Sequence, residues 1–439
     1  MKIQIPNSLA VAIIFLVCGL VLGAFGYGVW VSQDVATAPK VAELKEAIKI
    51  IKADLLDEVP WWYVPTKETS MVGRYDPQAV YPGLTLIATV EADDEIAVKV
   101  VDFDGTVLQQ WDPDWQAMWG DATHIPPDRI PKQKLAAIVH GVVLMPNNDI
   151  VFNFDGLGMM RLNACSEVVW RLPELTHHSM VQDSDGNLWA SSHIYEEEPI
   201  ERFPHLKTPR TVSSILKVSP EGKVLDELRI LDLLDDNGYR AYLFMGSVKP
   251  SPVVGQQGDI LHLNDVEIFP ADMEPGLFET GDILVSLRNI NSIFVADAAF
   301  EKIKYWLTGD FVRHHDPDFI DGNHISLYDN NNGGKADSSR IITIDARTDE
   351  ISVRYPRNDG DRFFSRIAGK HQRLPSGNVL ITESTAARAI EIAPNDAIVW
   401  EYRNIVAPGL LGMMQEAARL PAEVTAESLA TSRKTCNGS

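Results

Sequence analysis

Short apolar runs separated by turn residues dominate the chain from about residue 80 onward. The clearest example is 371–403, HQRLPSGNVLITESTAARAIEIAPNDAIVWEYR, where such runs alternate with a Pro-Ser-Gly-Asn turn and a Pro-Asn-Asp turn. Apolar runs of this length between such turns are typical of β-strands. We therefore predict strands at 371–374, 379–383, 389–392 and 398–402, which together form one four-stranded antiparallel unit.

Imperfect copies of this unit recur upstream. An opening copy spans 84–111, and every later copy has a histidine at or near its head. These histidines are His140, His178, His262, His315 and His371. A sheet of this size cannot bury a face alone, so the six units are expected to pack into a closed ring. The predicted fold class is all-β, a six-bladed β-propeller of four-stranded antiparallel blades.

A different pattern precedes the repeats. Residues 9–31 carry no charged side chain, and a helix of this length spans the roughly 30 Å hydrocarbon core of a bilayer. This predicts one uncleaved transmembrane anchor, with Lys2 on the cytoplasmic side and the repeats in the periplasm or another space outside the cytoplasm. A cleavable signal peptide is the competing interpretation. The run is long for one, and the Ala-x-Ala motif near its end is followed by Pro39.

After this anchor, residues 41–58 carry apolar side chains at helical spacing, which predicts a short stalk helix. The predicted organisation is an anchor over 1–33, a stalk or linker over 34–60, a propeller over 61–411 and a C-terminal tail over 412–439. The tail is expected to be helical and then disordered.

Composition and charge narrow the class of partner. The chain has 439 residues, 45% of them apolar and 23% charged, with a formal net charge of −22. This charge argues against nucleic acid or an anionic membrane surface as a partner, and an anionic substrate would need local cationic groups. Of the three cysteines, Cys18 falls in the predicted anchor. Cys165 and Cys436 are therefore a candidate disulfide pair outside the cytoplasm.

The histidines at the heads of the copies are the candidate chemical groups. The first strand of a propeller blade lines the central channel, so these side chains are expected to converge. A structural histidine that bonds within its own blade is the alternative. That alternative is open for His140 and His371, whose spacing to the following turn differs, whereas the functional interpretation is favoured for His178, His262 and His315.

Arg288, in LVSLRN, follows on the second strand of the blade that starts at His262. An arginine beside several histidines suits a tetrahedral oxyanion, because the planar guanidinium holds the anion while a neutral imidazole attacks it or passes protons. The sequence contains no Walker A or Rossmann glycine loop and no H-E-x-x-H, C-x-x-C or G-x-S-x-G motif. Nucleotide-dependent transfer and the common metal chemistries are therefore unsupported, and we expect no cofactor.

Over about residues 80–405 the sequence resembles the bacterial arylsulfate sulfotransferases. The resemblance rests on HLNDVEIFP, GDILVSLRN, RHHDPDFIDGNHISLYDN, and FFSRIAGKHQRLPSGNVLITES followed by IVWEY. It implies a six-bladed propeller that works outside the cytoplasm without the nucleotide sulfate donor. It also implies ping-pong transfer of a sulfuryl group from an aryl sulfate to a phenolic acceptor, through a sulfohistidine.

The resemblance assigns roles to individual positions. The nucleophile falls on His315, with His314 a close rival. The family's sulfate-binding histidine and arginine fall on His262 and Arg288. Its further channel histidine falls on His178, with His177 beside it, and all four are predicted to contact the substrate. This chain departs from the family pattern by a ten-residue insertion between the strands that carry His262 and Arg288.

Two other classes of function are compatible with the repeats. A non-catalytic propeller that serves as a binding scaffold would keep the blades but would need no histidines or arginine in its channel. A quinoprotein-type dehydrogenase is a weaker alternative, because its usual eight Trp-bearing blades are absent. Convergence of His178, His262, Arg288 and His315 in three dimensions favours the enzyme.

Overall fold

The computed structural model describes residue 23 and residues 59–127, 129–244, 259–333, 338–358, 362–434 and 436. The chain divides into two compact units, Met1–Trp61 and Trp62–Ser439. The predicted anchor at 9–31, apart from Gly23, and the predicted stalk at 41–58 lie outside the described residues. Within the described part of the chain, no helix has the length and apolar character that crossing a membrane requires.

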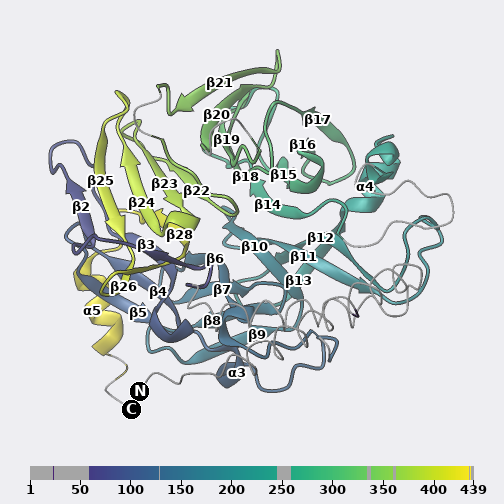
Figure 1. The fold of residues 1–439 in the computed structure, drawn as a ribbon. Helices are drawn as coiled ribbons and strands as arrows, with labels where there is room; N and C mark the ends of the chain where they lie inside the picture. The colour runs from purple at the N-terminus through teal and green to yellow at the C-terminus, as the bar shows by residue number, and fades with distance from the viewer. Residues whose placement is uncertain are drawn as a thin grey trace. The chain divides into compact units, whose positions relative to one another are not determined.

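The described part of the second unit consists mainly of antiparallel sheets, five of them with four strands (Figure 1). From the innermost strand outward, the first contains β28 (Met414–Arg419), β3 (Thr85–Val90), β4 (Ile96–Val101) and β5 (Val107–Trp111), and the second contains β6 (Val139–Leu144), β7 (Ile150–Phe154), β8 (Gly158–Leu162) and β9 (Val168–Leu172). The third contains β10 (Leu175–Gln182), β11 (Leu188–Glu196), β12 (Arg210–Val218) and β13 (Val224–Arg229), and the fourth contains β14 (Leu263–Ile268), β15 (Ile283–Leu287), β16 (Ser292–Ala296) and β17 (Ile303–Thr308). The fifth contains β18 (His315–Asp321), β19 (His324–Asp329), β20 (Arg340–Asp345) and β21 (Glu350–Tyr355).

A sixth sheet has five strands, and a small sheet has three. The sixth contains β22 (Lys370–Arg373), β23 (Val379–Glu383), β24 (Arg388–Ile392), β25 (Ile398–Arg403) and β2 (Val72–Tyr75). The small sheet contains β1 (Tyr63–Pro65), β27 (Leu410–Gly412) and β26 (Ile405–Ala407). The four strands predicted within 371–403 are confirmed to within one residue at each end.

Apolar side chains fill the spaces between neighbouring sheets. One cluster joins Phe152 of the second sheet to Leu86 of the first. Further clusters join the second sheet to the third, the third to the fourth, the fourth to the fifth and the fifth to the sixth. Another joins Trp400 of the sixth sheet to Ile87 of the first. Each sheet therefore buries its two faces against two neighbours, which is a propeller-like, all-β arrangement.

Both ends of the unit are tied into sheets from the opposite end of the chain. Strand β28 pairs with β3, so the first sheet takes its innermost strand from the C-terminal segment. Strand β2 pairs with β25, so the sixth sheet takes its outermost strand from the N-terminal segment. The prediction of a helical tail from residue 412 was therefore wrong for 414–419. Pairing with β3 decides the conformation there, although Gln415, Glu416 and the two following alanines are good helix formers.

The helices described within the second unit are short. They are α3 (Trp115–Met118), α4 (Ile230–Asp236), α5 (Ala426–Lys434) and the 3-10 turns η2 (Ala92–Asp94), η3 (Lys134–Ala137), η4 (Arg240–Phe244), η5 (Arg288–Ile290) and η6 (Ser384–Ala386). Cys165, which follows β8, forms a disulfide with Cys436, with 5.3 Å between the Cα atoms. The structure thus joins the candidate cysteine pair and ties the C-terminal segment to the second sheet.

Candidate active site

The candidate residues lie at one end of the innermost strands. His140, His178 and His315 lie on β6, β10 and β18, and His262 directly precedes β14. In each of these sheets the second strand runs antiparallel to the first, so the residue that follows the second strand returns to the same end. Arg288 follows β15 in this way. The topology therefore brings side chains from several sheets to one place.

Local irregularities in the innermost strands turn these side chains toward one another. The pairing register shifts between His177 and Met180 in β10, and His178 has a φ of +52°. His262 has a φ of +53°. In β6, Gly141 has a φ of +87°, and a Cβ there would lie 2.2 Å from the carbonyl oxygen of His178. Such bulges re-aim side chains and are frequent beside active sites, and Gly141 allows β6 and β10 to approach closely.

Three histidines and a carboxylate form a hydrogen-bonded chain. Asp259 accepts hydrogen bonds from the backbone N–H of His262 at 2.8 Å and from its Nδ1 at 2.5 Å. The Nε2 atom of His262 lies 3.3 Å from Nε2 of His178, and Nδ1 of His178 lies 2.8 Å from Nδ1 of His177. With Asp259 ionised and the rings neutral, His262 donates from Nδ1, His178 from Nε2 and His177 from Nδ1. We infer that Asp259 fixes the tautomer of all three rings.

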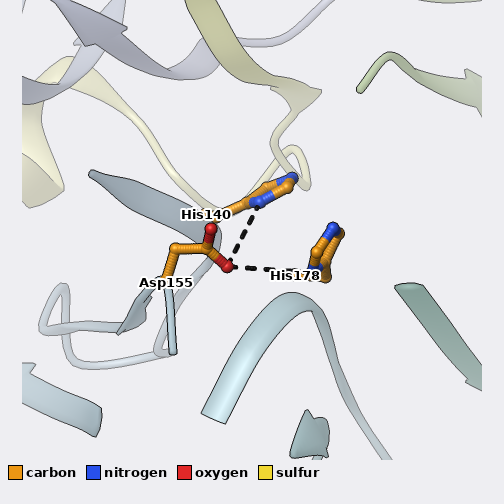
Figure 2. Close-up of side chains that lie close together, drawn as sticks. All are labelled: His140, Asp155 and His178. Carbon is orange, nitrogen blue, oxygen red and sulfur yellow. Dashed lines mark ion pairs between the residues drawn. The ribbon is translucent and has the colours of Figure 1, made fainter. Parts of the chain in front are cut away.

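His140 and Asp155 also lie close to His178 (Figure 2). One oxygen of Asp155 lies 3.8 Å from Nδ1 of His140 and 3.7 Å from Nδ1 of His178. The rings of His140 and His178 are 4.3 Å apart between centroids. Burial tends to raise the pKa of the Asp155 carboxyl, but the nearby His140, together with His177 and His262, holds it below its usual range. Asp155 therefore carries a negative charge beside the histidines.

The same two imidazoles and carboxylate are a possible set of metal ligands. Ligand atoms of His140, Asp155 and His178 all lie within 4.8 Å of one another. Two histidines and one carboxylate suit several divalent transition metals. The Nδ1 atom of His178, however, already has a hydrogen bond with His177, so a metal there would have to displace that bond.

His315 is buried and held by one hydrogen bond. Its Nδ1 lies 2.7 Å from the side-chain oxygen of Asn330. The Asn330 amide nitrogen donates to the carbonyl oxygens of Ser365 at 2.9 Å and Ala368 at 2.7 Å, so its oxygen must face the imidazole. An amide oxygen only accepts, and His315 therefore carries its proton on Nδ1. Among the described residues Nε2 of His315 has no hydrogen-bond partner, and its lone pair is available.

The neighbouring His314 has a different environment. Its side chain is fully buried, packs on the ring of Phe311 with 4.7 Å between centroids, and makes no well-formed hydrogen bond with either ring nitrogen. Burial lowers the pKa of His314 to about 3. The backbone of Ser292 acts in the opposite direction, and the charge of Arg288 lowers the pKa further. Such surroundings suit a packing residue, whereas a nucleophile must reach its substrate.

Arg288 is the cation of the site. Its backbone N–H donates to the carbonyl oxygen of His262 at 3.0 Å, which fixes where the side chain starts. The Nε atom is buried without a hydrogen-bond partner. Burial lowers the pKa of Arg288 to about 10, with Arg313 acting in the same direction and the carboxylates of Asp259 and Asp155 opposing it. Arg288 is thus protonated at neutral pH, with a donor available to an anion.

Burial also keeps the imidazoles of His315 and His178 uncharged. It lowers the pKa of His315 well below 6.5, and the charge of Arg288 acts in the same direction, while the Asn330 bond opposes it. The pKa of His178 is likewise lowered well below 6.5, first by burial and then by His140, His177 and His262. A neutral imidazole is the nucleophilic form.

The structure brings together most of the residues predicted from the sequence. His178 and His262 are in contact, and the charges of Arg288 and His140 act on His315. His371 lies apart from them, in contact with Asp316. The catalytic and binding roles assigned to these residues stay predictions.

Sequence reasoning missed the groups that orient the histidines. They are Asp155, His193, Asp259 and Asn330. His193 stacks on His177 with 4.0 Å between ring centroids. Asp259, three residues before His262, was within reach of a search for nearby carboxylates. Asp155 directly follows β7 and Asn330 directly follows β19, just as Arg288 follows β15, and each of these is the second strand of its sheet. Only the antiparallel topology places this position beside the histidines.

The sheets and the site define a propeller-like β protein with an arginine and neutral histidines suited to an oxyanion. The sequence profile of the arylsulfotransferase (ASST) family matches residues 141–405. The chain belongs to this family. No curated relative matches the sequence.

Several solved structures resemble the chain in part. A protein of unknown function from Bacteroides caccae has a TM-score of 0.43 and 11% identity, over 75% of this chain and 97% of that one. A virginiamycin B lyase from Staphylococcus aureus has a TM-score of 0.37 and 11% identity, over 79% of this chain and 89% of that one. The WD40 β-propeller domain of Doa1 has a TM-score of 0.37 and 9% identity, over 82% and 88%.

Proposed function

We propose that this protein transfers a sulfuryl group from an aryl sulfate to a phenolic acceptor through a sulfohistidine at His315. The observation that carries the proposal is the hydrogen bond from His315 to Asn330, which leaves Nε2 unprotonated and without a partner. Membership of the arylsulfotransferase family supports a sulfotransferase. The proposed chemistry needs no metal or other cofactor.

In the first half-reaction, the Nε2 lone pair of His315 attacks the sulfur atom of the donor. The N–S bond forms as the bond between sulfur and the aryl oxygen breaks, and the aryl oxide leaves with the electron pair. The ring keeps its Nδ1 proton, which is hydrogen-bonded to the oxygen of Asn330. The modified residue is therefore a zwitterion with a positive ring and a negative sulfonate. The leaving oxide then takes a proton from solvent or from the chain of histidines that ends at Asp259.

In the second half-reaction, a phenol attacks the sulfur of the sulfohistidine. Its oxygen forms the new S–O bond and its proton goes to a neighbouring base, while the N–S electrons return to Nε2. Histidine suits both steps because it is a good nucleophile and a good leaving group near neutral pH. The neutral ring of His178 is the candidate base.

Arg288 is the proposed sulfate-binding cation. The chain as a whole carries a formal charge of −22, so an anionic donor must be held by local positive charge. The buried Nε donor without a partner meets that requirement. A preorganised donor of this kind stabilises charge that gathers on the sulfuryl oxygens in the transition state.

We further propose that the six sheets of the second unit are the blades of a closed propeller, held outside the cytoplasm by an uncleaved helix at residues 9–31. The apolar clusters between successive sheets support the closed ring. The Cys165–Cys436 disulfide supports an oxidising compartment. Retention in the membrane fraction after a carbonate wash tests the anchor, and release of a shortened chain that starts near residue 39 would contradict it.

The decisive experiment is a burst measurement without acceptor. Incubation with a chromogenic aryl sulfate should release about one phenol per chain and add one acid-labile sulfuryl group to the peptide that contains His315. His315→Ala should remove both signals. His324→Ala is the matched control, because His324 lies on the next strand, bonds to Asp321 and should leave the burst unchanged.

Arg288 variants test the binding role in the same assay. Arg288→Ala should slow sulfation roughly 100-fold or more, the scale of losing an oxyanion donor. Arg288→Lys should restore only part of the rate, because the planar fork is lost. If a broad panel of aryl sulfates leaves the wild-type protein unmodified, a non-catalytic scaffold becomes the better interpretation.

A further inference from the structure

We propose that the innermost strands hold a second, oxygen-rich site that binds a divalent cation, with Ca²⁺ the best candidate. The site is a cluster of five carboxylates, which we call the carboxylate cluster. They are Asp265 and Glu267 on β14, Asp316 and Asp318 on β18, and Glu416 on β28. Lys370 and His371 of β22 lie among them.

The cluster is short of positive charge. Lys370 Nζ lies 3.4 Å from Asp316 and 3.6 Å from Glu416. Nδ1 of His371 lies 2.9 Å from Asp316, and Nε2 lies 2.8 Å from the Ser326 hydroxyl. Lys370 and a protonated His371 together supply at most two positive charges to five carboxylates. The remainder must be met by protons or by another cation.

Asp265 gives an independent indication of a missing ligand. Its side chain is fully buried, and neither carboxylate oxygen has a hydrogen-bond partner. The Ser179 hydroxyl is nearby but outside good hydrogen-bonding geometry, and the charges of Lys370, Asp316 and Glu416 act directly on the Asp265 carboxyl. A buried carboxylate costs several kcal/mol unless it is paired, so both oxygens point to a bound proton or metal ion.

The geometry of the cluster suits a metal ion. Ligand atoms of Asp316, Asp318 and His371 all lie within 4.8 Å of one another, which is the span that oxygen ligands at about 2.4 Å from a Ca²⁺ ion can cover. Nε2 of His371 and an oxygen of Asp318 face each other at 3.5 Å. Both ring nitrogens of His371 already have hydrogen-bond partners, Asp316 and Ser326, so the expected ligands are the carboxylate oxygens and His371 orients Asp316.

The choice of Ca²⁺ follows from the donor set. Carboxylates are hard oxygen donors, and Ca²⁺ takes oxygen ligands in a flexible geometry.

This site is separate from the proposed sulfate site. Asp316 directly follows His315 on β18, but its carboxylate bonds to His371 and Lys370, away from the Asn330 side of His315. A bound ion would tie together the innermost strands of the first, fourth and fifth sheets, next to β22 of the sixth. Its expected role is to hold the strand that carries His315, and the ion takes no part in sulfuryl transfer.

The test measures ion content and ion-dependent stability of the full-length protein. Purified protein should contain about one Ca²⁺ per chain by elemental analysis. Treatment with EDTA should lower the melting temperature, and added Ca²⁺ at 100-fold excess over its Kd should restore it by at least about 3 °C. Mg²⁺ and Mn²⁺ are titrated in parallel arms, and calorimetry on the stripped protein measures the stoichiometry.

Variants locate the ion. Asp318→Asn, whose side chain is partly exposed, should abolish the Ca²⁺-dependent shift, and Asp265→Asn is a second variant. Asp321→Asn lies on the same strand with an exposed side chain and should keep the full shift. Asp155→Asn tests whether the ion is held instead by His140, Asp155 and His178. In that case Asp155→Asn would lose the Ca²⁺-dependent melting shift and Asp318→Asn would keep it.

Two outcomes would overturn the proposal. The first is stripped wild-type protein that shows no heat of binding and no melting shift with any of the three ions at millimolar concentration, which means that protons neutralise the cluster. The second is an unchanged shift in Asp318→Asn, which means that the ion binds elsewhere. The wild-type titration decides the first point even if Asp265→Asn fails to fold.

Discussion

The proposed chemistry depends on three hydrogen bonds of the Asn330 side chain. Its amide nitrogen donates to two carbonyl oxygens, and its oxygen accepts a hydrogen bond from Nδ1 of His315. Without that acceptor the imidazole can populate the other tautomer, in which Nε2 carries the proton and cannot attack. A single side chain thus sets the reactive form of the nucleophile.

Asn330→Ala should therefore slow the burst of phenol release by roughly 10- to 100-fold, with little change in KM for the donor. The reason is a loss of the competent tautomer, while the sulfate-binding arginine is untouched. Asn331→Ala is the neighbouring control, since Asn331 bonds to the Ser338 carbonyl oxygen and does not contact His315. A rate for Asn330→Ala equal to that of the control would show that Asn330 does not position His315.

His314 makes the stability of the protein depend on pH. Its pKa is about 3 in the folded state, against about 6.5 in an unfolded chain. Between these values the unfolded chain binds the extra proton, so the stabilising contribution is complete above pH 6.5. It is lost as the pH falls, by about 1.4 kcal/mol per pH unit for one such group.

His314→Leu should remove this dependence. Urea unfolding of wild type and variant between pH 6 and pH 4.5 should show a free energy of unfolding that falls less steeply in the variant, by about one proton. Equal slopes would mean that His314 titrates normally in the fold. The variant also tests chemistry, because a burst that survives in His314→Leu assigns the nucleophile to His315.

At the scale of elements, the heads of the innermost strands form the site through irregular pairing. Strand β6 can approach β10 only because residue 141 has no Cβ and accepts a φ of +87°. Substitution there would push the His178 carbonyl, and with it the chain of histidines. The strand irregularity is thus a condition for the contacts of His178.

Gly141→Ala should lower both the melting temperature and the rate of phenol release, because the added methyl group would overlap the His178 carbonyl oxygen. Gly156→Ala is a matched control, since its φ is +70° but nothing lies within 4 Å of the added Cβ. The control should lose about 1 kcal/mol from backbone strain alone and keep its activity. Similar losses of stability and activity in the two variants would mean that glycine is needed at residue 141 for its positive φ, and not for the close approach of the His178 carbonyl oxygen.

Some of the strands could be predicted from the sequence, and others could not. Strands within 371–403 were predictable because their turns carry proline, glycine and asparagine, whose backbone preferences are local. Strand β28 was not, since its partner β3 lies more than three hundred residues earlier and its own residues favour a helix. The histidines at the strand heads recur and so were found. Asp155 and Asn330 sit in no repeated motif, and their place beside the histidines follows only from the pairing of strands.

At the scale of the whole molecule, β28 completes the first sheet and should be essential to it. A chain that ends after Gly412 lacks β28 and leaves β3 with an unpaired edge. A chain that ends after Leu420 keeps β28 but loses α5 and the cysteine that pairs with Cys165. The two truncations therefore separate closure of the sheets from the disulfide.

The chain ending after Gly412 should fail to give soluble, cooperatively melting protein. The chain ending after Leu420 should fold and melt cooperatively at a lower temperature, because the covalent link across a long loop is gone. Circular dichroism melts of both chains, beside the full-length protein under reducing conditions, give the comparison. Cooperative melting of the shorter chain at the full-length temperature would argue against a closed ring.

The C-terminal origin of β28 also sets an order of events during biosynthesis. Strands β3, β4 and β5 leave the ribosome early, but the strand that completes their sheet follows about 300 residues later. At about 5–20 residues per second, the edge of β3 stays open for roughly 15–60 s. During that interval it is a template for wrong pairing, and a chaperone that covers β-strand edges would act on it. Cys436 is made later still, so its bond to Cys165 can close only after β28 has been synthesised.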